Sequence, residues 1–150
     1  MTNKVKIPKK IHFIWFGGTK PWYIDYYIHT VKKAYPDFEV KIWGEKDFDP
    51  DSTTYTKRAK EARKWAFVSD YLRVKILSEE GGIYLDTDMV PIKDVRALLN
   101  HRVVIGWEYN KMVSTGFVAA VPGHPIFEKV LNTYDSFNDL EKPFKFLVNK

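Results

Sequence analysis

The chain has 150 residues, of which 45% are apolar, so its length and composition fit one globular domain with a buried core. It contains no cysteine, which excludes a disulfide framework, a thiolate zinc site and a cysteine nucleophile. The net charge of +5 favours anionic partners such as nucleic acid, acidic lipid or phosphorylated small molecules, unless the basic residues only form a solvated face.

The first part of the chain has the pattern of a strand, a helix and a second strand. A short apolar run over 10–16, closed by two glycines, is typical of a strand covered on both faces. Apolar residues then recur at helical spacing over 22–35, and Pro36 ends this helix. Apolar and polar residues alternate over 38–43, which indicates the next strand. These segments together predict one βαβ unit.

A long helix is predicted over 55–80, basic and amphipathic in its first half and apolar nearly all round in its second. Gly81 and Gly82 end this helix, and a strand follows over 83–90, before Pro91. The remaining elements are a short helix at 94–100, strands at 103–107 and 115–121, a helix from 125 to about 136 with Pro125 at its first position, and a last helix at 139–150. This alternation predicts an α/β domain with a mixed or parallel sheet.

No apolar stretch reaches the ~18 residues that a membrane span needs. The N-terminus also lacks the apolar core of a signal peptide. We therefore expect a soluble, cytoplasmic protein.

Two aspartates, Asp86 and Asp88, follow the apolar start of the predicted 83–90 strand. The string Asp-x-Asp occurs three times here, but the two earlier copies lie in a proline-containing loop at 47–51, where aspartate is common in turns. In an extended chain, residues two apart point the same way, which would place both carboxylates on one face, after Tyr84. Such oxygen ligands suit Mg²⁺ or Mn²⁺, with phosphates and water completing the shell. The segment is therefore either a metal–diphosphate site at the carboxyl end of a strand or a polar strand end.

Asp70 and Arg73 form a second charged pair, inside the apolar half of the predicted long helix. They are three residues apart and share a helix face, and charges in an apolar helix must pair with each other or face a polar cleft. They therefore either lock the helix as an internal ion pair or line a pocket, with Asp70 accepting from hydroxyls and Arg73 donating to an anion. Trp15, just before Gly17 and Gly18, is either a stacking platform for a base or a core residue.

Three blocks in this order resemble the glycosyltransferases of family 32, the group called the sugar-binding region containing the DXD motif. They are IPKKIHFIWFGG at 7–18, KWAFVSDYLR at 64–73 and GGIYLDTD at 81–88. The resemblance covers about residues 7 to 95, and the stretches at 114–117 and 123–125 are also similar to the family. It implies the Rossmann-like nucleotide-diphospho-sugar transferase (GT-A type) fold, an α/β fold with a mixed, mostly parallel sheet.

The resemblance also implies an activity. Bacterial capsular and lipopolysaccharide sugar transferases and yeast mannosyltransferases belong to this group, so we expect a retaining hexosyltransferase of polysaccharide biosynthesis. It would depend on Mn²⁺ or Mg²⁺ and move a sugar from a nucleotide-diphosphate donor to a saccharide or another hydroxyl acceptor. We expect a UDP-sugar donor, with a GDP-sugar as the alternative.

By matching position, Trp15 would stack on the nucleotide base, and Asp70 and Arg73 would hold the donor sugar and its diphosphate side. Asp86 would contact ribose and sugar, and Asp88 would coordinate the divalent cation directly. The expected nucleotide-sugar-binding residues are Trp15, Asp70, Arg73, Tyr84 and Asp86, the expected catalytic residues are Asp70, Arg73, Asp86 and Asp88, and the expected metal ligands are Asp88 and Asp86.

Family members continue well beyond the length of this chain. We therefore expect residues 1–150 to form a single nucleotide-sugar-binding glycosyltransferase domain that lacks the family's C-terminal part. One alternative is a non-catalytic binding module of the same fold. Another is a basic domain that binds polyanions, but this gives no reason for Asp70, Asp86 and Asp88, which would repel phosphate without a metal. We expect no nucleic-acid partner, whereas the basic segments at 4–10 and 57–64 suit peripheral association with a membrane.

Overall fold

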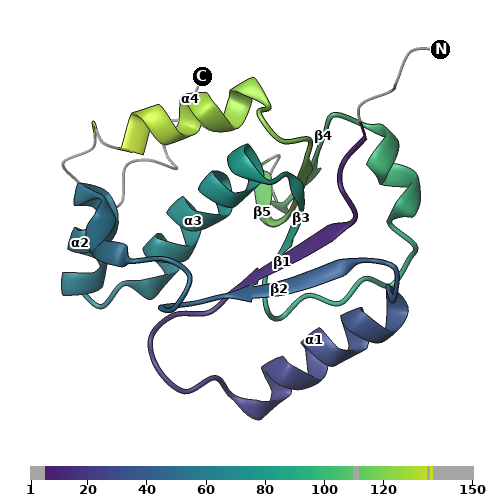
Figure 1. The fold of residues 1–150 in the computed structure, drawn as a ribbon, viewed down its shortest axis with the longest axis horizontal. Coiled ribbons are helices and arrows are strands. Elements are labelled where there is room, and N and C mark those ends of the chain that lie inside the picture. Colours follow the sequence, from purple (N-terminus) through teal and green to yellow (C-terminus); the bar gives the residue numbers. More distant parts are fainter. Residues whose placement is uncertain (1–5, 110–111, 135, 137–150) are drawn as a thin grey trace.

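The computed structural model describes residues 6–109, 112–134 and 136. Within these residues a five-stranded sheet has the order β2-β1-β3-β5-β4 (Figure 1). The strands are β1 (Lys10–Ile14), β2 (Glu39–Trp43), β3 (Gly82–Leu85), β4 (Val103–Trp107) and β5 (Val113–Ala120).

The strand directions confirm an α/β fold with a mixed, mostly parallel sheet. Strand β1 lies between β2 and β3 and is parallel to both. Strand β5 pairs antiparallel with β3 on one side and with β4 on the other. Among the described strands β5 therefore runs opposite to the other four, and the carboxyl ends of β1, β2 and β3 meet at one edge of the sheet.

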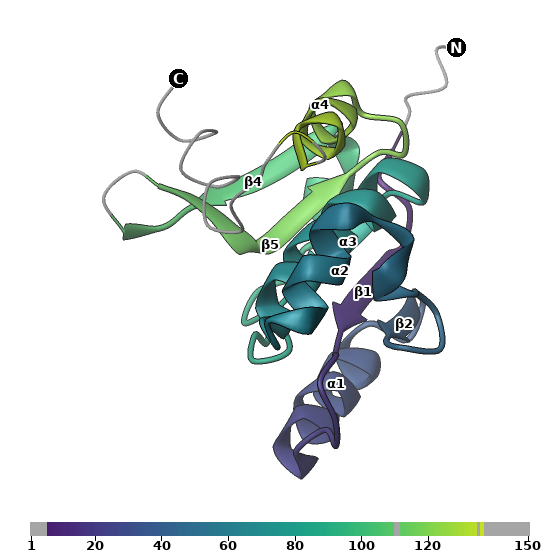
Figure 2. The same ribbon diagram turned by 90° about the vertical axis from the view of Figure 1, so that its left-hand side faces the viewer.

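Helices cover both faces of the sheet (Figures 1 and 2). One face carries α1 (Trp22–Ala34), whose buried residues Ile24, Ile28 and Val31 follow helical spacing and pack in a core cluster with β1 and β3 residues. The other face carries α2 (Thr54–Glu61), α3 (Trp65–Glu79) and α4 (Pro125–Tyr134), which share a second core cluster. Two short 3₁₀ helices, η1 (Pro50–Ser52) and η2 (Arg96–Asn100), complete the described elements.

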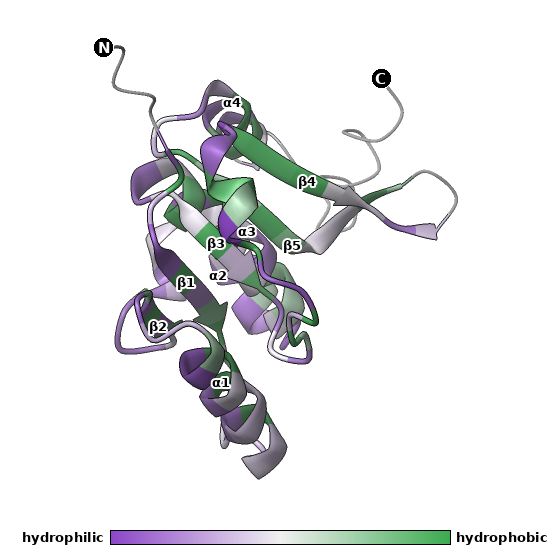
Figure 3. Ribbon diagram, turned by 90° about the vertical axis from the view of Figure 1, so that its right-hand side faces the viewer, coloured by the Kyte–Doolittle hydropathy of each residue, from purple (hydrophilic) through white to green (hydrophobic). Residues whose placement is uncertain are grey.

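Hydropathy differs from strand to strand. In Figure 3 hydrophobic residues predominate along β4 and β5. None of the helices within the described ranges combines the length and the apolar character that a membrane crossing requires.

The helix predicted over 55–80 is wrong in one respect, because two helices occupy this range. Helix α2 ends at Glu61 and α3 begins at Trp65. Between them Arg63 has a φ of 54°, which makes it the one non-glycine residue with positive φ in the described part of the chain. The break falls where the amphipathic pattern becomes apolar nearly all round. The amphipathic α2 and the more buried α3 are therefore separate helices.

The strand predicted over 83–90 is also shorter than expected. Strand β3 ends at Leu85, and a turn follows in which the Met89 amide donates to the Asp86 carbonyl oxygen at 3.0 Å. Asp86 and Asp88 therefore do not lie on an extended strand, and the spacing argument that placed both on one strand face is wrong.

The other predictions differ little from the structure. The strand at 103–107 is confirmed, the strand predicted from 115 begins at Val113, and α4 begins at Pro125. The short helix predicted at 94–100 is the 3₁₀ helix η2. The helix predicted at 139–150 lies outside the described residues.

His12 connects three elements from the middle of β1, where it is fully buried. Its Nε2 lies 2.8 Å from the Gly81 carbonyl oxygen, and its Nδ1 lies 3.1 Å from the Trp43 indole nitrogen. Since a carbonyl only accepts and an indole N–H only donates, Nε2 carries the proton and the ring is neutral. Burial lowers the pKa of His12, which favours the same neutral form.

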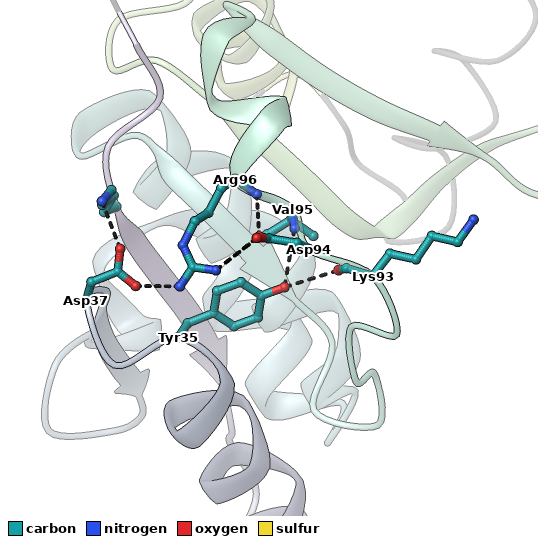
Figure 4. Close-up of polar contacts among 7 residues, drawn as sticks. Tyr35, Asp37, Lys93, Asp94, Val95 and Arg96 are labelled. Atoms are coloured by element: carbon teal, nitrogen blue, oxygen red, sulfur yellow. Dashed lines mark hydrogen bonds and ion pairs between the residues drawn. The ribbon is translucent and has the colours of Figure 1, made fainter.

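A polar network ties the segment after β3 to the opposite end of α1 (Figure 4). The Tyr35 hydroxyl donates to the Lys93 carbonyl oxygen at 3.1 Å and lies 3.3 Å from the Val95 amide, which donates to it. The Arg96 guanidinium donates to Asp37 at 2.6 Å and holds the pKa of that carboxyl well below its usual range. The segment that carries the two aspartates is therefore fixed at its far end.

Candidate active site

A cleft of about 500 Å³ opens where the parallel strands β1 and β3 end. This is the edge at which open α/β sheets bind ligands. The cleft is walled by the residues after β1, the start of α1, one face of α3 and the segment after β3. Of the residues predicted from the sequence, it brings together Trp15, Arg73, Tyr84, Asp86 and Asp88.

Asp70, the remaining predicted residue, does not line this cleft. Its Oδ1 accepts a hydrogen bond from Arg73 Nη2 at 2.7 Å, and both side chains are largely buried. The sequence left open whether this pair is an internal ion pair or lines a pocket. In the structure Asp70 acts as the internal partner, whereas Arg73 also lines the cleft.

Arg73 connects several parts of the site. Its Nη1 donates to the Thr115 carbonyl oxygen at 2.6 Å, and Nη2 lies 3.7 Å from Asp86 Oδ1 as well as bonding Asp70. The guanidinium carbon lies 4.6 Å from the centre of the Tyr84 ring. Its Nε is buried without a hydrogen-bond partner among the described residues. A positive charge is therefore held beside the carboxylates with one donor unused.

The electrostatics of the buried side of the site follow from burial. Burial raises the pKa of Asp70 to about 6, the nearby Asp86 charge adds to this effect, and Arg73 opposes it. Burial also raises the pKa of Tyr84 above its usual range. Tyr84 therefore keeps its proton and donates to Asp86 Oδ1 at 2.6 Å.

The two aspartates of the motif have different surroundings. Asp86 is fixed, because its amide donates to the Gly116 carbonyl oxygen at 2.9 Å and its carboxylate accepts from Tyr84. A Cβ at Gly116 would lie 2.9 Å from Asp86 Oδ2, so glycine here leaves room for the Asp86 carboxylate in its present position. Asp88 is exposed, and its carboxylate makes no hydrogen bond or ion pair to another described residue. Asp88 is thus available to a ligand.

The carboxylates of the cleft suit a cation that a phosphate ligand also coordinates better than a cation held by the protein alone. Within residues 6–109, 112–134 and 136, no group of three or more His, Cys, Asp or Glu side chains could hold a metal ion. Asp86 and Asp88 supply two carboxylates, while Mg²⁺ takes six ligands and commonly receives some from phosphates. The residues therefore fit a divalent cation that binds together with a diphosphate.

Aromatic rings form the other end of the cleft. Trp15 is half-buried, and its indole N–H donates to the Gly18 carbonyl oxygen at 3.0 Å. The rings of Phe16 and Trp65 are stacked, with centroids 6.4 Å apart and an interplanar angle of 8°. A Cβ at Gly17, whose φ is 93°, would lie 2.4 Å from the Trp65 ring. This end offers flat apolar surfaces for a planar ligand.

Sequence reasoning did not assign Trp65 and Ser69 to the site. Both line the cleft, and with Arg73 they form a row at intervals of four residues along α3. Such residues share one helix face. This spacing from the predicted Arg73 is the signal that would have found them.

Fold and cleft together define an α/β protein with stacking surfaces, an arginine and two carboxylates at the carboxyl edge of its parallel strands. The family model described as the glycosyltransferase sugar-binding region containing the DXD motif matches residues 21–105. The chain therefore belongs to this family, as the three sequence blocks predict.

Individual relatives support this assignment. The chain is 30% identical over 115 residues to "Subversion of eukaryotic traffic protein A" of Legionella pneumophila, a match covering 59% of this chain and 18% of that protein. It is 28% identical over 138 residues to an uncharacterized glycosyltransferase of Acanthamoeba polyphaga mimivirus, covering 83% of this chain and 54% of the relative.

A solved structure shares the fold. The PaToxG glycosyltransferase superimposes with a TM-score of 0.66 at 24% identity, over 93% of this chain and 65% of that one. This likeness confirms the predicted glycosyltransferase fold. In all three comparisons the chain spans less than two thirds of its relative.

Proposed function

We propose that this chain is the donor-binding domain of a metal-dependent, retaining glycosyltransferase. It moves a sugar from a nucleotide diphosphate, a UDP-sugar or alternatively a GDP-sugar, to a saccharide or another hydroxyl acceptor. The observation that carries this proposal is the convergence of Trp15, Arg73, Asp86 and Asp88 on one cleft. Family membership supports the same donor and acceptor classes.

Each end of the cleft suits one part of the donor. Trp15 and Trp65 offer ring faces to the base, and the Arg73 guanidinium places a positive charge beside the diphosphate. Asp88 and Asp86 would hold Mn²⁺ or Mg²⁺ against the diphosphate oxygens. The cation supplies Lewis-acid stabilisation of the leaving diphosphate when it is bound.

We assign Asp70 a positioning role within this site. Its side chain is largely buried outside the cleft lining and its carboxylate bonds the Arg73 guanidinium, so its effect on the donor passes through Arg73. This differs from the direct sugar contact implied by the family resemblance.

In the reaction, the acceptor hydroxyl oxygen forms a bond to the anomeric carbon as the bond to the diphosphate oxygen breaks. The diphosphate leaves with the electrons of the broken bond, and the hydroxyl proton passes to a diphosphate oxygen or to solvent. We name no nucleophile among the cleft residues, and retention at the anomeric carbon is carried over from the family resemblance.

A second candidate is a module that binds the nucleotide-sugar without transfer. It rests on the same cleft residues as the transferase, because these account for donor binding and not for transfer. Donor hydrolysis or transfer in the presence of a bound nucleotide separates the two candidates.

Peripheral membrane association is a further proposal that depends on the basic residues. Part of their charge is neutralised, because Lys60 pairs with Asp51 at 2.6 Å and Lys9 pairs with Asp37 at 2.8 Å. Sedimentation with anionic vesicles at rising salt concentration tests it, and binding that does not weaken with salt would contradict it.

Thermal unfolding with a panel of nucleotides, with and without Mn²⁺, tests the main proposal. A ligand at ~100 times its Kd adds about 2.7 kcal/mol to the unfolding free energy. For a domain of this size that raises Tm by a few degrees. If no nucleotide gives a metal-dependent shift, both the transferase and the binding-module proposals fail.

Asp88→Ala should abolish the metal-dependent part of this shift, because it removes the unpaired carboxylate at the cleft. Asp51→Ala is the matched control, since Asp51 also belongs to an Asp-x-Asp string but lies outside the cleft. A metal-dependent shift that survives in Asp88→Ala would show that the ligand assignment is wrong.

A further inference from the structure

Helix α1 exposes an aromatic face that the packing of the core does not explain. Trp22 is 79% exposed, Tyr23 46% and Tyr26 61%. The core needs only the opposite stripe of this helix, where Ile24 and Ile28 are buried. A group of large exposed apolar side chains of this kind marks an interaction surface.

The rings of this face hold one another in place. Trp22 and Tyr23 meet edge to face, with centroids 6.2 Å apart at 80°. Tyr27 contacts Tyr23 at 6.4 Å and Tyr26 at 6.0 Å, again at steep angles. Such contacts restrict the side chains before a partner binds, which lowers the entropic cost of binding.

The aromatic face begins at the candidate active site. Tyr23 forms part of the cleft wall together with Arg73, Asp86 and Asp88, whereas Trp22 and Tyr26 lie outside the cleft. A surface that continues from the cleft mouth is where the remainder of a long acceptor would lie while its terminal hydroxyl reaches the donor.

The charge on this face favours a neutral partner. Asp25 lies among the rings and is paired with Lys20, and no lysine or arginine occurs in α1 before Lys32. An anionic lipid surface would require basic residues beside the rings. Indole and phenol rings instead offer flat faces to the C–H faces of sugar rings, and their N–H and O–H groups can hydrogen-bond sugar hydroxyls.

We propose that Trp22, Tyr23 and Tyr26 form a stacking platform for a neutral saccharide chain, the acceptor of the reaction. The identification of this saccharide as the acceptor rests on the proposed transferase function. The platform adjoins the cleft through Tyr23, while Trp22 and Tyr26 lie outside it.

Binding of the full chain to an array of neutral and charged oligosaccharides tests the platform. We expect wild type to retain at least one class of neutral oligosaccharide. Trp22→Ala and Tyr26→Ala should each weaken that binding by about tenfold or more, the size expected when one aromatic stacking surface is lost. Trp107→Ala is the matched control, because Trp107 is 76% exposed but lies on the edge strand β4.

The platform is wrong if no neutral oligosaccharide binds wild type, or if Trp22→Ala binds oligosaccharides as wild type does. It is also wrong if Trp22→Ala and Trp107→Ala lose oligosaccharide binding equally. Loss of binding to phosphatidylcholine vesicles, and not to glycans, in Trp22→Ala would indicate a lipid partner instead. Circular dichroism and Tm of each variant show whether it is folded. Tyr26→Ala provides the second test if Trp22→Ala fails to fold.

The nucleotide-induced rise in Tm, measured on the same proteins, separates this inference from the proposed function. We expect it to be unchanged in Trp22→Ala and Tyr26→Ala, because neither residue lines the cleft. Where transfer is measured, these variants should raise the KM for the acceptor about tenfold and leave the KM for the donor unchanged. Glycan binding without any nucleotide response would support the platform and overturn the transferase.

Discussion

Arg73 shows how much of this site depends on one residue. It bonds the Asp70 carboxylate and the Thr115 carbonyl oxygen, and it lies within 3.7 Å of Asp86. Its charge therefore compensates two carboxylates, one of them buried. Removing it would leave Asp70 buried and unpaired, which costs far more than the loss of an exposed ion pair.

We predict that Arg73→Ala lowers the free energy of unfolding by about 3–5 kcal/mol, the range seen when one member of a buried pair is removed. Urea unfolding measures this loss. Arg96→Ala is the control, since its ion pairs are largely exposed and should contribute much less. Equal losses in the two variants would show that the Arg73 pair is not buried as described.

The same pair predicts that the double variant Asp70→Asn/Arg73→Ala is more stable than Arg73→Ala alone. Removing the Asp70 charge relieves the unpaired carboxylate, so the two changes are not additive. A double-mutant cycle by urea unfolding measures the coupling. Strict additivity would contradict the direct interaction between the two side chains.

His12 predicts a loss of stability on mild acidification. Its folded-state pKa lies below the ordinary value of 6.5, so the unfolded chain takes up a proton that the folded chain refuses. The contribution of His12 is complete above pH 6.5 and is lost as pH falls towards the folded pKa. Asp70 acts with the opposite sign, because its raised pKa of about 6 removes stability as pH rises from about 4 to 6.

Comparison of wild type with His12→Gln isolates the histidine effect. The difference in unfolding free energy between the two proteins should be constant above pH 7 and should change by at most about 1.4 kcal/mol per pH unit below 6.5. Identical pH profiles for the two proteins would refute the assignment of a neutral, buried His12.

At the scale of elements, the structure agrees best with the sequence where the apolar period is unambiguous. The stripe of Ile24, Ile28 and Val31 predicts α1, and Pro125 predicts the start of α4. The break between α2 and α3 was not predictable, because Arg63 carries none of the usual signals of a left-handed residue. The end of β3 was missed since Met89 and Val90 resume an apolar pattern after Asp88.

Two sequence signals indicated residues of the cleft, and a third signal, the spacing along α3, was not used. The strand-end position of Asp86 and the placement of Arg73 in an apolar helix both led to the cleft that the structure shows. Spacing along α3 would have added Trp65 and Ser69. The separation of Asp70 from the cleft depends on tertiary packing, which spacing along one helix does not contain.

The helix break itself gives a testable consequence. Arg63 adopts a left-handed backbone, which costs an L-residue with a Cβ about 1–2 kcal/mol. We predict that Arg63→Gly is neutral or stabilises the protein by up to about 1 kcal/mol, part of the gain being offset by the entropy of glycine. Lys57→Gly, inside α2, should instead destabilise by about 1 kcal/mol. Destabilisation by Arg63→Gly in chemical unfolding would contradict the assigned φ.

At the scale of the whole molecule, the site is assembled from both faces and both halves of the sheet. The parallel strands β1 and β3 end at the cleft, and α1 and α3 line it from opposite faces of the sheet. Strand β5 runs antiparallel to β3 beside it. The two core clusters are separate from the predicted metal ligands, because both are built from apolar side chains.

This predicts how the molecule responds to metal removal. A chelator such as EDTA should leave Tm unchanged in the absence of nucleotide, because two carboxylates alone do not hold a resident cation. The same chelator should remove most of the Tm increase given by a nucleotide with Mn²⁺. A large drop in Tm on chelation without nucleotide would indicate a resident structural metal.

Strand β5 serves the site through its backbone alone. The Thr115 carbonyl oxygen accepts from Arg73 and the Gly116 carbonyl oxygen accepts from the Asp86 amide. A Cβ at position 116 would lie 2.8 Å from Met89 Sδ and 2.9 Å from Asp86 Oδ2. A substitution of the Thr115 side chain therefore keeps the carbonyl oxygen that Arg73 uses. At position 116 an added Cβ would displace the side chains of Met89 and Asp86. A search for functional sites that scores only chemically reactive residue types would pass over this strand, although two of the site's hydrogen bonds end there.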